Sequence, residues 1–302
     1  MALYLVTGGA GFIGSNLVKE LLSLGHQVRV LDNYYGGRFD KRIFPEAEYI
    51  EGSIMSLTDL RRACAGVSGV FHMAAIPRHA FSVSNPIETH EVNVTGTLNV
   101  LFIAKELGVK RVVFSASSAA YGNQDVASFA ESLPTMPMSP YGLHKLIGEE
   151  YCTLFSKLYG LSTVSLRYFN VYGPLMDPAG DYALVIGKFL NQKKAGLPMT
   201  ICGDGEYFRD YVHVSDVAQA NILAMESDKV GQGELINVGT GKANLVNELV
   251  SIIGGNSVFI SERPGDPRRT EADITKAKEL LGFNPLVDLS SGIDGVRGEF
   301  GF

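Results

Sequence analysis

The chain has 302 residues, and its 32 acidic side chains outnumber its 26 basic ones to give a formal net charge of −6. This balance excludes the basic surface by which proteins bind nucleic acid or anionic membranes, so we expect neither partner. The apolar runs extend over a few residues, whereas a membrane-spanning helix needs roughly 20. Three cysteines without CxxC spacing favour a reduced, cytoplasmic protein with no metal site.

Short β-branched segments alternate with longer segments of helical period through the first half of the chain. Strands are predicted at 3–7, 28–32, 48–50, 70–73, 111–115 and 163–168. Apolar residues recur at helical spacing in 13–24, 92–107 and 141–159. Parallel strands covered by helices on both faces form a doubly wound α/β sheet, the Rossmann arrangement, and this is the predicted fold class.

The alternation becomes irregular after Tyr172. A helix is predicted at 182–192, a strand at 199–202, a helix at 215–227 capped by Ser215 and Asp216, and a strand at 234–238. We expect a Rossmann domain over 1–172, to which about 210–240 return, and a smaller α/β substrate lobe over 173–302. The segment after Pro285 is polar and weakly patterned, so we expect little regular structure there.

Gly8, Gly11 and Gly14 form a GxxGxxG motif directly after the first strand and at the start of the first helix. Glycines at this position let the backbone approach a pyrophosphate, whose charge the helix N-terminus stabilises. Asp32 ends the second strand, where its carboxylate can accept both ribose hydroxyls and would repel a 2′-phosphate. The pattern predicts NAD binding, although a tight turn without a ligand would explain the glycines alone.

Tyr141 and Lys145 form a YxxxK pair, whose spacing places both side chains on one face of a helix. A lysine ammonium one turn away favours the phenolate form of a tyrosine. A surface Tyr and Lys would be the simpler interpretation of the pair alone. The segment SASSAAYG follows the fifth strand at the carboxyl edge of the sheet, and it favours a catalytic role for the pair.

TGGAGFIG, SASSAAYG, SPYGLHK and LRYFNVYGP together resemble the extended short-chain dehydrogenase/reductase family, in its nucleotide-sugar epimerase branch. GDG at 203–205, RDYVH at 209–213 and RPGD at 263–266 extend the resemblance over nearly the whole chain. The resemblance implies NAD as cofactor and a UDP-sugar as substrate. It also implies Ser117, Tyr141 and Lys145 as catalytic residues, with Tyr141 as the general base.

The same resemblance implies two sets of binding residues. The cofactor set is Gly8, Gly11, Phe12, Ile13, Gly14, Asp32, Asn33, Ser53, Ile54, Ala74, Ala75, Asn93, Ser115, Tyr141 and Lys145. The substrate set is Ser117, Ser118, Tyr141, Asn170, Leu184, Arg209, Arg263, Asp266 and Thr270. Ser53 departs from the family, whose members usually have an aspartate there that binds the adenine amine, so this contact is in doubt.

The reaction expected from the resemblance is 4-epimerisation, in which NAD accepts hydride from sugar C4 while Tyr141 removes the hydroxyl proton. Dehydratases and decarboxylases of the branch carry a glutamate just beyond the catalytic Ser or Thr, where this chain has Ser118 and Ala119. Thr270 stands where glucose-restricted relatives have a bulky tyrosine. We therefore expect UDP-glucose and UDP-galactose as substrates, with room for the acetamido group of UDP-N-acetylglucosamine and UDP-N-acetylgalactosamine.

Other interpretations stay open. Arg268 and Arg269, or Arg78 or His79, could face the carboxylate of UDP-glucuronate. A dehydratase, a net reductase and a non-catalytic NAD-sensing protein are further alternatives. The histidines at 72, 79, 90 and 213 lack metal-ligand spacing and are interpreted as surface or core residues. The resemblance also implies a homodimer, and the apolar residues expected to support it are Leu98, Leu101, Leu146, Leu154 and Leu158.

Overall fold

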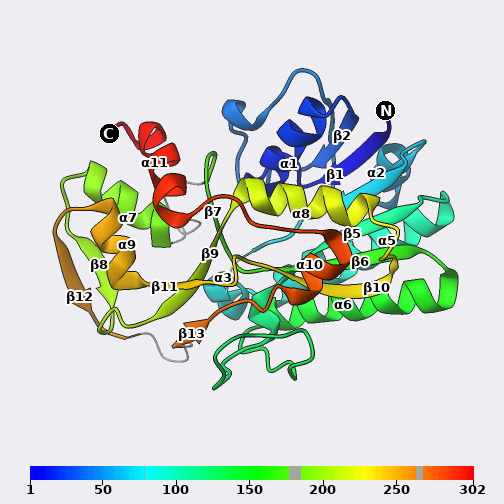
Figure 1. The fold of residues 1–302 in the computed structure, drawn as a ribbon. Coiled ribbons are helices and arrows are strands. Elements are labelled where there is room, and N and C mark those ends of the chain that lie inside the picture. The colour runs from blue at the N-terminus through cyan, green and yellow to red at the C-terminus, as the bar shows by residue number, and fades with distance from the viewer. Residues whose placement is uncertain (78, 177–184, 263–267) are drawn as a thin grey trace.

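The centre of the structure, a computed structural model that describes residues 1–77, 79–176, 185–262 and 268–302, is a parallel seven-stranded sheet (Figure 1). Its order is β10-β6-β5-β4-β1-β2-β3. The strands are β1 (Leu3–Thr7), β2 (Gln27–Asp32), β3 (Glu48–Glu51), β4 (Gly69–His72), β5 (Arg111–Ser117), β6 (Ser162–Tyr168) and β10 (Gln232–Val238). Because all neighbours pair in parallel, the carboxyl ends meet at one edge. The predicted Rossmann sheet is confirmed.

Helices cover both faces of this sheet and bury two separate apolar clusters. One face carries α1 (Phe12–Ser23), α8 (Val214–Glu226) and α10 (Thr275–Leu281). The other carries α2 (Leu57–Cys64), α5 (Gly96–Glu106) and α6 (Pro140–Tyr159). Neighbouring strand residues such as Leu5 and Val6 enter different clusters, because successive side chains of a strand point to opposite faces.

Several short elements lie at the edges of the sheet. A 3₁₀ turn, η1 (Asp40–Arg42), follows β2, and α3 (His79–Ser84) and α4 (Pro86–His90) follow β4. A π-helical turn, η2 (Glu91–Thr95), then leads into α5, and a second 3₁₀ turn, η3 (Ser118–Ala120), follows β5. Such π turns are frequent at functional sites, and this one precedes a helix that begins beside the carboxyl edge.

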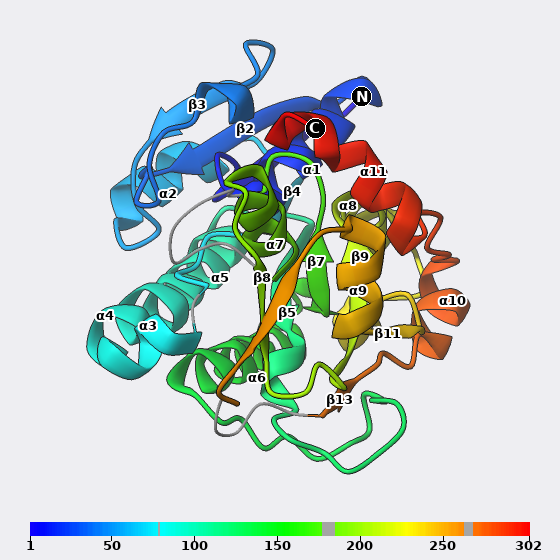
Figure 2. The same ribbon diagram turned by 90° about the vertical axis from the view of Figure 1, so that its left-hand side faces the viewer.

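The C-terminal part of the chain builds two smaller sheets and a third apolar cluster. Strand β9 (Phe208–His213) pairs with β7 (Asn170–Tyr172), β11 (Ala243–Leu245) and β13 (Arg269–Thr270), and β8 (Met199–Cys202) pairs with β12 (Ser257–Ile260). Helices α7 (Val185–Lys194), α9 (Val246–Ile253) and α11 (Leu289–Phe300) pack together over these strands (Figure 2).

The expectation of little regular structure after Pro285 is wrong. Helix α11 occupies this segment, and its Ile293 and Val296 are fully buried. Gly292 is needed because a Cβ there would lie 2.1 Å from the phenol oxygen of Tyr172. The apolar residues of this segment recur at helical spacing, but the glycines between them make the pattern hard to recognise in the sequence.

Both ends of α8 are fixed by side chains. The predicted cap is wrong, since His213 is the N-cap and its Nδ1 accepts a hydrogen bond from the Ser215 amide at 3.3 Å. At the other end, the Nη1 of Arg111 donates to the carbonyl oxygens of Ala224, Met225 and Ser227 at 2.9, 3.0 and 2.8 Å. Arg111 begins β5, so this end of α8 is anchored at the amino edge of the sheet.

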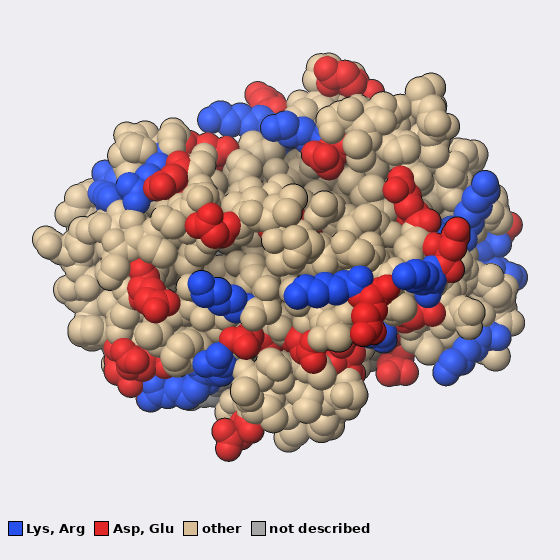
Figure 3. Space-filling model, in the orientation of Figure 1, with Lys and Arg blue, Asp and Glu red and all other residues tan. Residues whose placement is uncertain are grey.

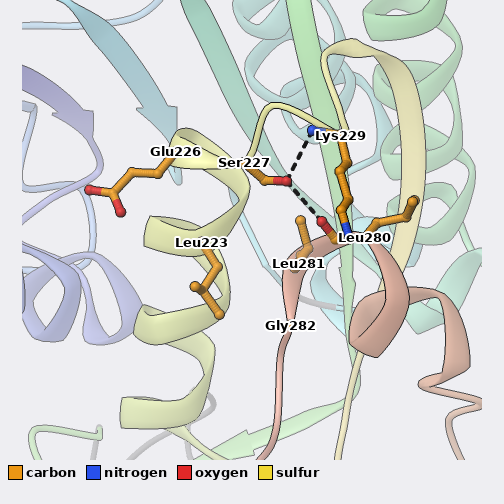
Figure 4. A pocket seen from close by; sticks show the side chains of 7 residues that line it. All are labelled: Leu223, Glu226, Ser227, Lys229, Leu280, Leu281 and Gly282. Atoms are coloured by element: carbon orange, nitrogen blue, oxygen red, sulfur yellow. Dashed lines mark hydrogen bonds between the residues drawn. The ribbon is translucent and has the colours of Figure 1, made fainter.

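A shallow pocket between α8 and α10 is lined by Leu223, Glu226, Ser227, Lys229, Leu280, Leu281 and Gly282 (Figure 4). It lies beside the α8 end that Arg111 anchors, away from the carboxyl edge where doubly wound sheets hold their ligands. On the face shown in Figure 3, basic side chains are interspersed with acidic ones. Across the described ranges, no helix has the length and apolarity needed to cross a bilayer.

Candidate active site

The glycine turn after β1 is built by close backbone contacts. Gly8 has φ +70°, and a Cβ on it would lie 2.7 Å from the backbone of Ala74. A Cβ on Gly14 would lie 2.2 Å from the carbonyl oxygen of Gly8. Gly11 is the N-cap of α1, and within the described chain no side chain caps that helix and its first turn holds no acid. The first amides, those of Phe12 and Ile13 among them, and the positive helix end therefore suit a bound pyrophosphate.

Asp32 joins the end of β2 to this turn. Its Oδ2 accepts a hydrogen bond from the Ala10 amide at 2.9 Å, and its Oδ1 accepts one from the Tyr34 amide at 2.8 Å. Burial raises the pKa of this carboxyl, while the two amides and Arg42 oppose the rise. Each carboxylate oxygen has a second lone pair, so Asp32 keeps the capacity to accept from a ribose diol.

The other predicted adenosine residues lie at the neighbouring strand ends. Asn33 follows Asp32, and its Oδ1 accepts from the Tyr35 amide at 3.2 Å. Ser53 and Ile54 follow β3. The Oγ of Ser53 accepts from the Met55 amide at 3.1 Å, which leaves its single hydroxyl proton to donate. Ser53 therefore offers a hydroxyl in place of the carboxylate that the resemblance leads us to expect.

The segment after β4 forms the opposite side of the cleft. Ala74 lies against Gly8, and Ala75 follows it. Asn93, on η2, holds this segment through the oxygen and the nitrogen of its side-chain amide. Its Oδ1 accepts from the Ile76 amide at 2.8 Å, and its Nδ2 donates to the Ile76 carbonyl at 3.0 Å. The structure thus brings the glycine turn and the predicted Ala74, Ala75 and Asn93 together.

Ser117 and Tyr141 meet at the carboxyl edge of β5. Helix α6 is positioned there by Ser139, whose Oγ accepts from the Gly142 amide at 3.1 Å, and by Ser82, whose Oγ accepts from the Tyr141 amide at 3.0 Å. Burial raises the pKa of the Tyr141 phenol, and a hydrogen bond from Ser117 opposes this rise. The hydroxyl of Ser117 and the phenol of Tyr141 therefore lie close enough to interact at this edge.

Lys145 lies one turn further along α6 and is buried. Its Nζ donates to the carbonyl of Ser115 at 2.6 Å. Burial lowers its pKa to about 8, and the negative charge of Glu149 acts in the opposite direction. The structure thus places a buried amine beside the strand that ends in Ser117.

The predicted substrate residues are distributed over several elements. Ser118 begins η3 directly after Ser117. The Nδ2 of Asn170 donates to the carbonyl of Asp210 at 3.0 Å. Arg209 and Thr270 are register partners on β9 and β13. Leu184, Arg263 and Asp266 lie outside the described residues, as does Arg78.

Sequence reasoning missed Asp210, which lies inside the RDYVH motif and is fully buried. Its Oδ1 accepts from the amide and hydroxyl of Thr240, and its Oδ2 accepts from the amides of Gly241 and Ala272. Burial raises its pKa, and these hydrogen bonds oppose the rise. Asp210 thereby fixes β9 and the position of Arg209 beside it. Its place inside this motif, directly after the predicted Arg209, was the only signal in the sequence.

Two of the residues proposed to face a uronate carboxylate, Arg268 and Arg269, already have acidic partners. The Nη1 of Arg268 donates to both carboxylate oxygens of Asp204, at 2.8 and 3.0 Å. The Nη2 of Arg269 donates to Glu271 at 2.6 Å, and its Nε donates to the Ala127 carbonyl. In the part of the chain that the structure describes, no group of three His, Cys, Asp or Glu side chains is arranged to hold a metal ion.

The parallel sheet and the glycine turn at the start of α1 define an α/β protein of the dinucleotide-binding class. Residues 4–239 match the NAD dependent epimerase/dehydratase family. The chain belongs to this family, and its cofactor is NAD. The family assignment made from the motifs is confirmed.

Similar proteins match nearly the whole chain. A protein of Methanocaldococcus jannaschii named a putative UDP-glucose 4-epimerase is 40% identical over 300 residues, 97% of this chain and 96% of that protein. A UDP-glucose 4-epimerase from Thermotoga maritima, solved with UDP-glucose, has a TM-score of 0.93 at 40% identity and covers 99% of this chain and 98% of its own. A UDP-N-acetylglucosamine 4-epimerase from Methanobrevibacter ruminantium, solved with UDP-N-acetylmuramic acid, has a TM-score of 0.91 at 33% identity and 99% coverage of both.

Lys145 is expected to make the stability of the fold depend on pH. Its folded pKa of about 8 lies below the value of about 10.4 for an unfolded lysine. At a pH below the pKa of the folded state, the buried charge of Lys145 therefore lowers the free energy of unfolding. This cost decreases as the pH rises from the folded-state pKa to the unfolded-state pKa. The free energy of unfolding of the wild type should therefore rise between about pH 7 and pH 10 by about 2 kcal/mol more than that of Lys145→Met, which lacks the titrating group.

Urea unfolding at both pH values measures this difference. Lys157→Met, at an exposed position on the same helix, is the matched control for loss of a lysine. Equal pH dependence of the two variants would show that Lys145 is not desolvated as the structure indicates.

Proposed function

We propose that the protein is an NAD-dependent 4-epimerase of UDP-hexoses. The observation that carries the proposal is the meeting of Ser117 and Tyr141 at the carboxyl edge of β5, with Lys145 buried one helical turn away. These groups lie on the same edge of the sheet as the glycine turn. A hydroxyl pair beside a nicotinamide cleft is the arrangement that hydride removal from an alcohol requires.

In the proposed reaction, Tyr141 accepts the proton of the sugar C4 hydroxyl while Ser117 holds the oxygen by a hydrogen bond. NAD, held by the glycine turn and Asp32, would supply the hydride acceptor for C4 and the hydride donor for the opposite face of the 4-keto sugar. Tyr141 then gives the proton back, so no reductant is consumed. In the proposed mechanism the positive charge of protonated Lys145, one helical turn away, acts in favour of the Tyr141 phenolate and against the burial that raises the pKa of this phenol.

The residues after Ser117 support epimerisation over elimination. Ser118 and Ala119 occupy η3, and neither side chain can serve as a carboxylic acid or base. The similar proteins from Methanocaldococcus jannaschii and Thermotoga maritima carry the name UDP-glucose 4-epimerase. A UDP-glucuronate 4-epimerase is the less favoured alternative, because Arg268 and Arg269 are paired with Asp204 and Glu271.

The proposal divides the chain into a cofactor part and a substrate part. Residues 1–172 form the cofactor part, to which α8, β10 and α10 also belong, since they complete the main sheet and its helical layer. Residues 173–302 otherwise form the substrate lobe around the third apolar cluster. Asn170, Arg209 and Thr270 are the proposed substrate residues among those described, and Arg209 supplies a guanidinium for the diphosphate.

A cytoplasmic setting is part of the same proposal. Cys64, Cys152 and Cys202 are free thiols. Burial raises the pKa of Cys64 and Cys152 to about 12, so neither forms a reactive thiolate near neutral pH. Unpaired cysteines are typical of proteins from reducing compartments.

The proposed activity is tested by incubating the purified protein, without reductant, with UDP-glucose, UDP-N-acetylglucosamine or UDP-glucuronate. Anomeric proton NMR should detect the galacto epimer of at least the first two sugars. Tyr141→Phe should lower kcat by at least about a hundredfold, because it removes the general base. Tyr151→Phe, on the same helix, is the matched control. Failure to form any 4-epimer with NAD supplied would reject the epimerase proposal.

Thr270 is proposed to admit the acetamido group. Its side chain is partly buried, its Oγ1 has no hydrogen-bond partner among the described residues, and it lies beside Arg209. Thr270→Tyr should lower kcat/KM for UDP-N-acetylglucosamine by about tenfold or more relative to UDP-glucose, because the ring fills the space of the N-acetyl group. Thr240→Val, which removes a hydroxyl bonded to Asp210, should lower both values alike. An unchanged ratio in Thr270→Tyr would place the N-acetyl group elsewhere.

We further propose a homodimer formed by α5 and α6 of two copies. Phe102 on α5 is 44% exposed, and Leu154 and Leu158 on α6 are 44% and 63% exposed. Leu101, also expected to support the dimer, is fully buried in the core and contributes nothing to this surface. Exposed apolar side chains on two adjacent helices fit an isologous interface.

Sedimentation velocity tests the dimer. The wild-type chain should sediment as a dimer, and the double variant Leu154→Glu with Leu158→Glu should sediment as a monomer, since two buried carboxylates would oppose association. Leu286→Glu changes a leucine that is 71% exposed elsewhere on the surface, and it should leave the dimer intact. A dimer that survives the double variant would locate the interface on another face.

A further inference from the structure

His72 lies at the centre of a hydrogen-bond network that the proposed reaction does not use. It ends β4, is 1% exposed, and both its ring nitrogens are bonded. Its Nδ1 lies 2.8 Å from the hydroxyl of Thr7, the last residue of β1. Its Nε2 lies 3.0 Å from the hydroxyl of Thr97 on α5. The ring therefore joins two central strands to the helix that packs behind them.

The surrounding groups fix which nitrogen carries the proton. The Thr97 hydroxyl donates to the carbonyl of Asn93 at 2.7 Å, so it can only accept from the imidazole, and Nε2 carries the hydrogen. The Thr7 hydroxyl accepts from the Ala74 amide at 3.3 Å and donates its own proton to Nδ1. Burial and the charge of Lys145 lower the pKa of His72 to about 3, which keeps the ring neutral.

Both ends of this network reach residues of the cofactor cleft. At one end, Thr7 precedes Gly8, and it binds the amide of Ala74, whose backbone lies against Gly8. At the other end, Thr97 binds Asn93, whose side chain holds both backbone groups of Ile76. The ring therefore lies on a continuous chain of hydrogen bonds between the glycine turn and the segment after β4.

We propose that His72 is a positioning residue that sets the separation between the glycine turn and the segment 74–76, and so the shape of the cleft that receives NAD. The inference rests on the proposed function, because it names a determinant of cofactor binding at the same site. The imidazole works as a spacer with one donor and one acceptor. Its length and its fixed tautomer hold Thr7 and Thr97 apart at one distance.

The test removes one hydroxyl group of the network at a time while preserving side-chain shape, so each threonine variant loses the two hydrogen bonds of that hydroxyl. Thr7→Val and Thr97→Val each remove one of the two hydroxyl groups that are bonded to His72. His72→Gln keeps a side-chain N–H that can donate to Thr97, but it changes the shape of the side chain. Thr163→Val is the matched control, since Thr163 is equally buried and its hydroxyl donates to the Cys152 carbonyl at 2.8 Å. For each protein, titration calorimetry measures the dissociation constant for NAD, and the melting temperature measures stability.

Thr7→Val and Thr97→Val should each weaken NAD binding by about threefold to tenfold, a change of the size that one buried hydrogen bond contributes, because only part of the lost hydrogen bonding is transmitted to the NAD site. His72→Gln should weaken it at least as much, while kcat at saturating NAD stays within about twofold of wild type. Thr163→Val should lower the melting temperature without changing the dissociation constant. If the network variants lose stability but bind NAD as wild type does, His72 has a structural role only and the inference is wrong.

The measurements separate this inference from the proposed function. A wild-type protein that binds NAD but forms no 4-epimer contradicts the epimerase proposal alone, and the network variants still decide the role of His72. A wild-type protein that epimerises, with variants of unchanged NAD affinity, contradicts the inference alone. A wild-type protein that does not bind NAD overturns both.

Discussion

The close approach of Gly8 to Ala74 is the contact on which the site depends. The two residues begin the turns after β1 and β4, which are neighbours in the sheet. The turn after β1 leads to α1 on one face, whereas the segment after β4 leads toward α5 on the other. Chains that diverge in this way open a crevice at the carboxyl edge of a parallel sheet. Any side chain on Gly8 would force the two turns apart and change the floor of that crevice.

The chemistry beside the crevice depends on how α6 is fixed to the sheet. Glu149, one turn beyond Lys145, accepts hydrogen bonds from the Nε and Nη2 of Arg167 on β6 at 2.9 and 2.7 Å. The guanidinium carbon also lies 4.3 Å from the ring centre of Tyr121. A buried pair of this kind is costly to break. It therefore specifies the rotation of α6 that points Tyr141 toward Ser117 and Lys145 toward Ser115.

Local spacing explains which parts of the site could be predicted from the sequence. The glycine motif, Asp32 and the YxxxK pair each follow from a short pattern whose geometry is set by one turn or one helix. His72 and Asp210 carry no such pattern, because their partners lie far from them in the sequence. Helical periodicity gives α5 an apolar face, but it cannot tell that Leu101 faces the core and Phe102 the surface. For α11, three glycines hide the periodicity, and only the space needed by Tyr172 explains Gly292.

Because Arg111 anchors α8 at the amino edge of the sheet, the residues that hold the framework are separate from the residues of the site at the carboxyl edge. One guanidinium at the amino edge holds the end of the helix through three carbonyl groups, 2.8 to 3.0 Å away, and none of these bonds involves a residue of the cofactor or substrate sets. The framework can therefore stay constant while the segments at the opposite edge diversify. New sugar specificities can arise in such a chain by substitutions after the strands, without a matching loss of stability.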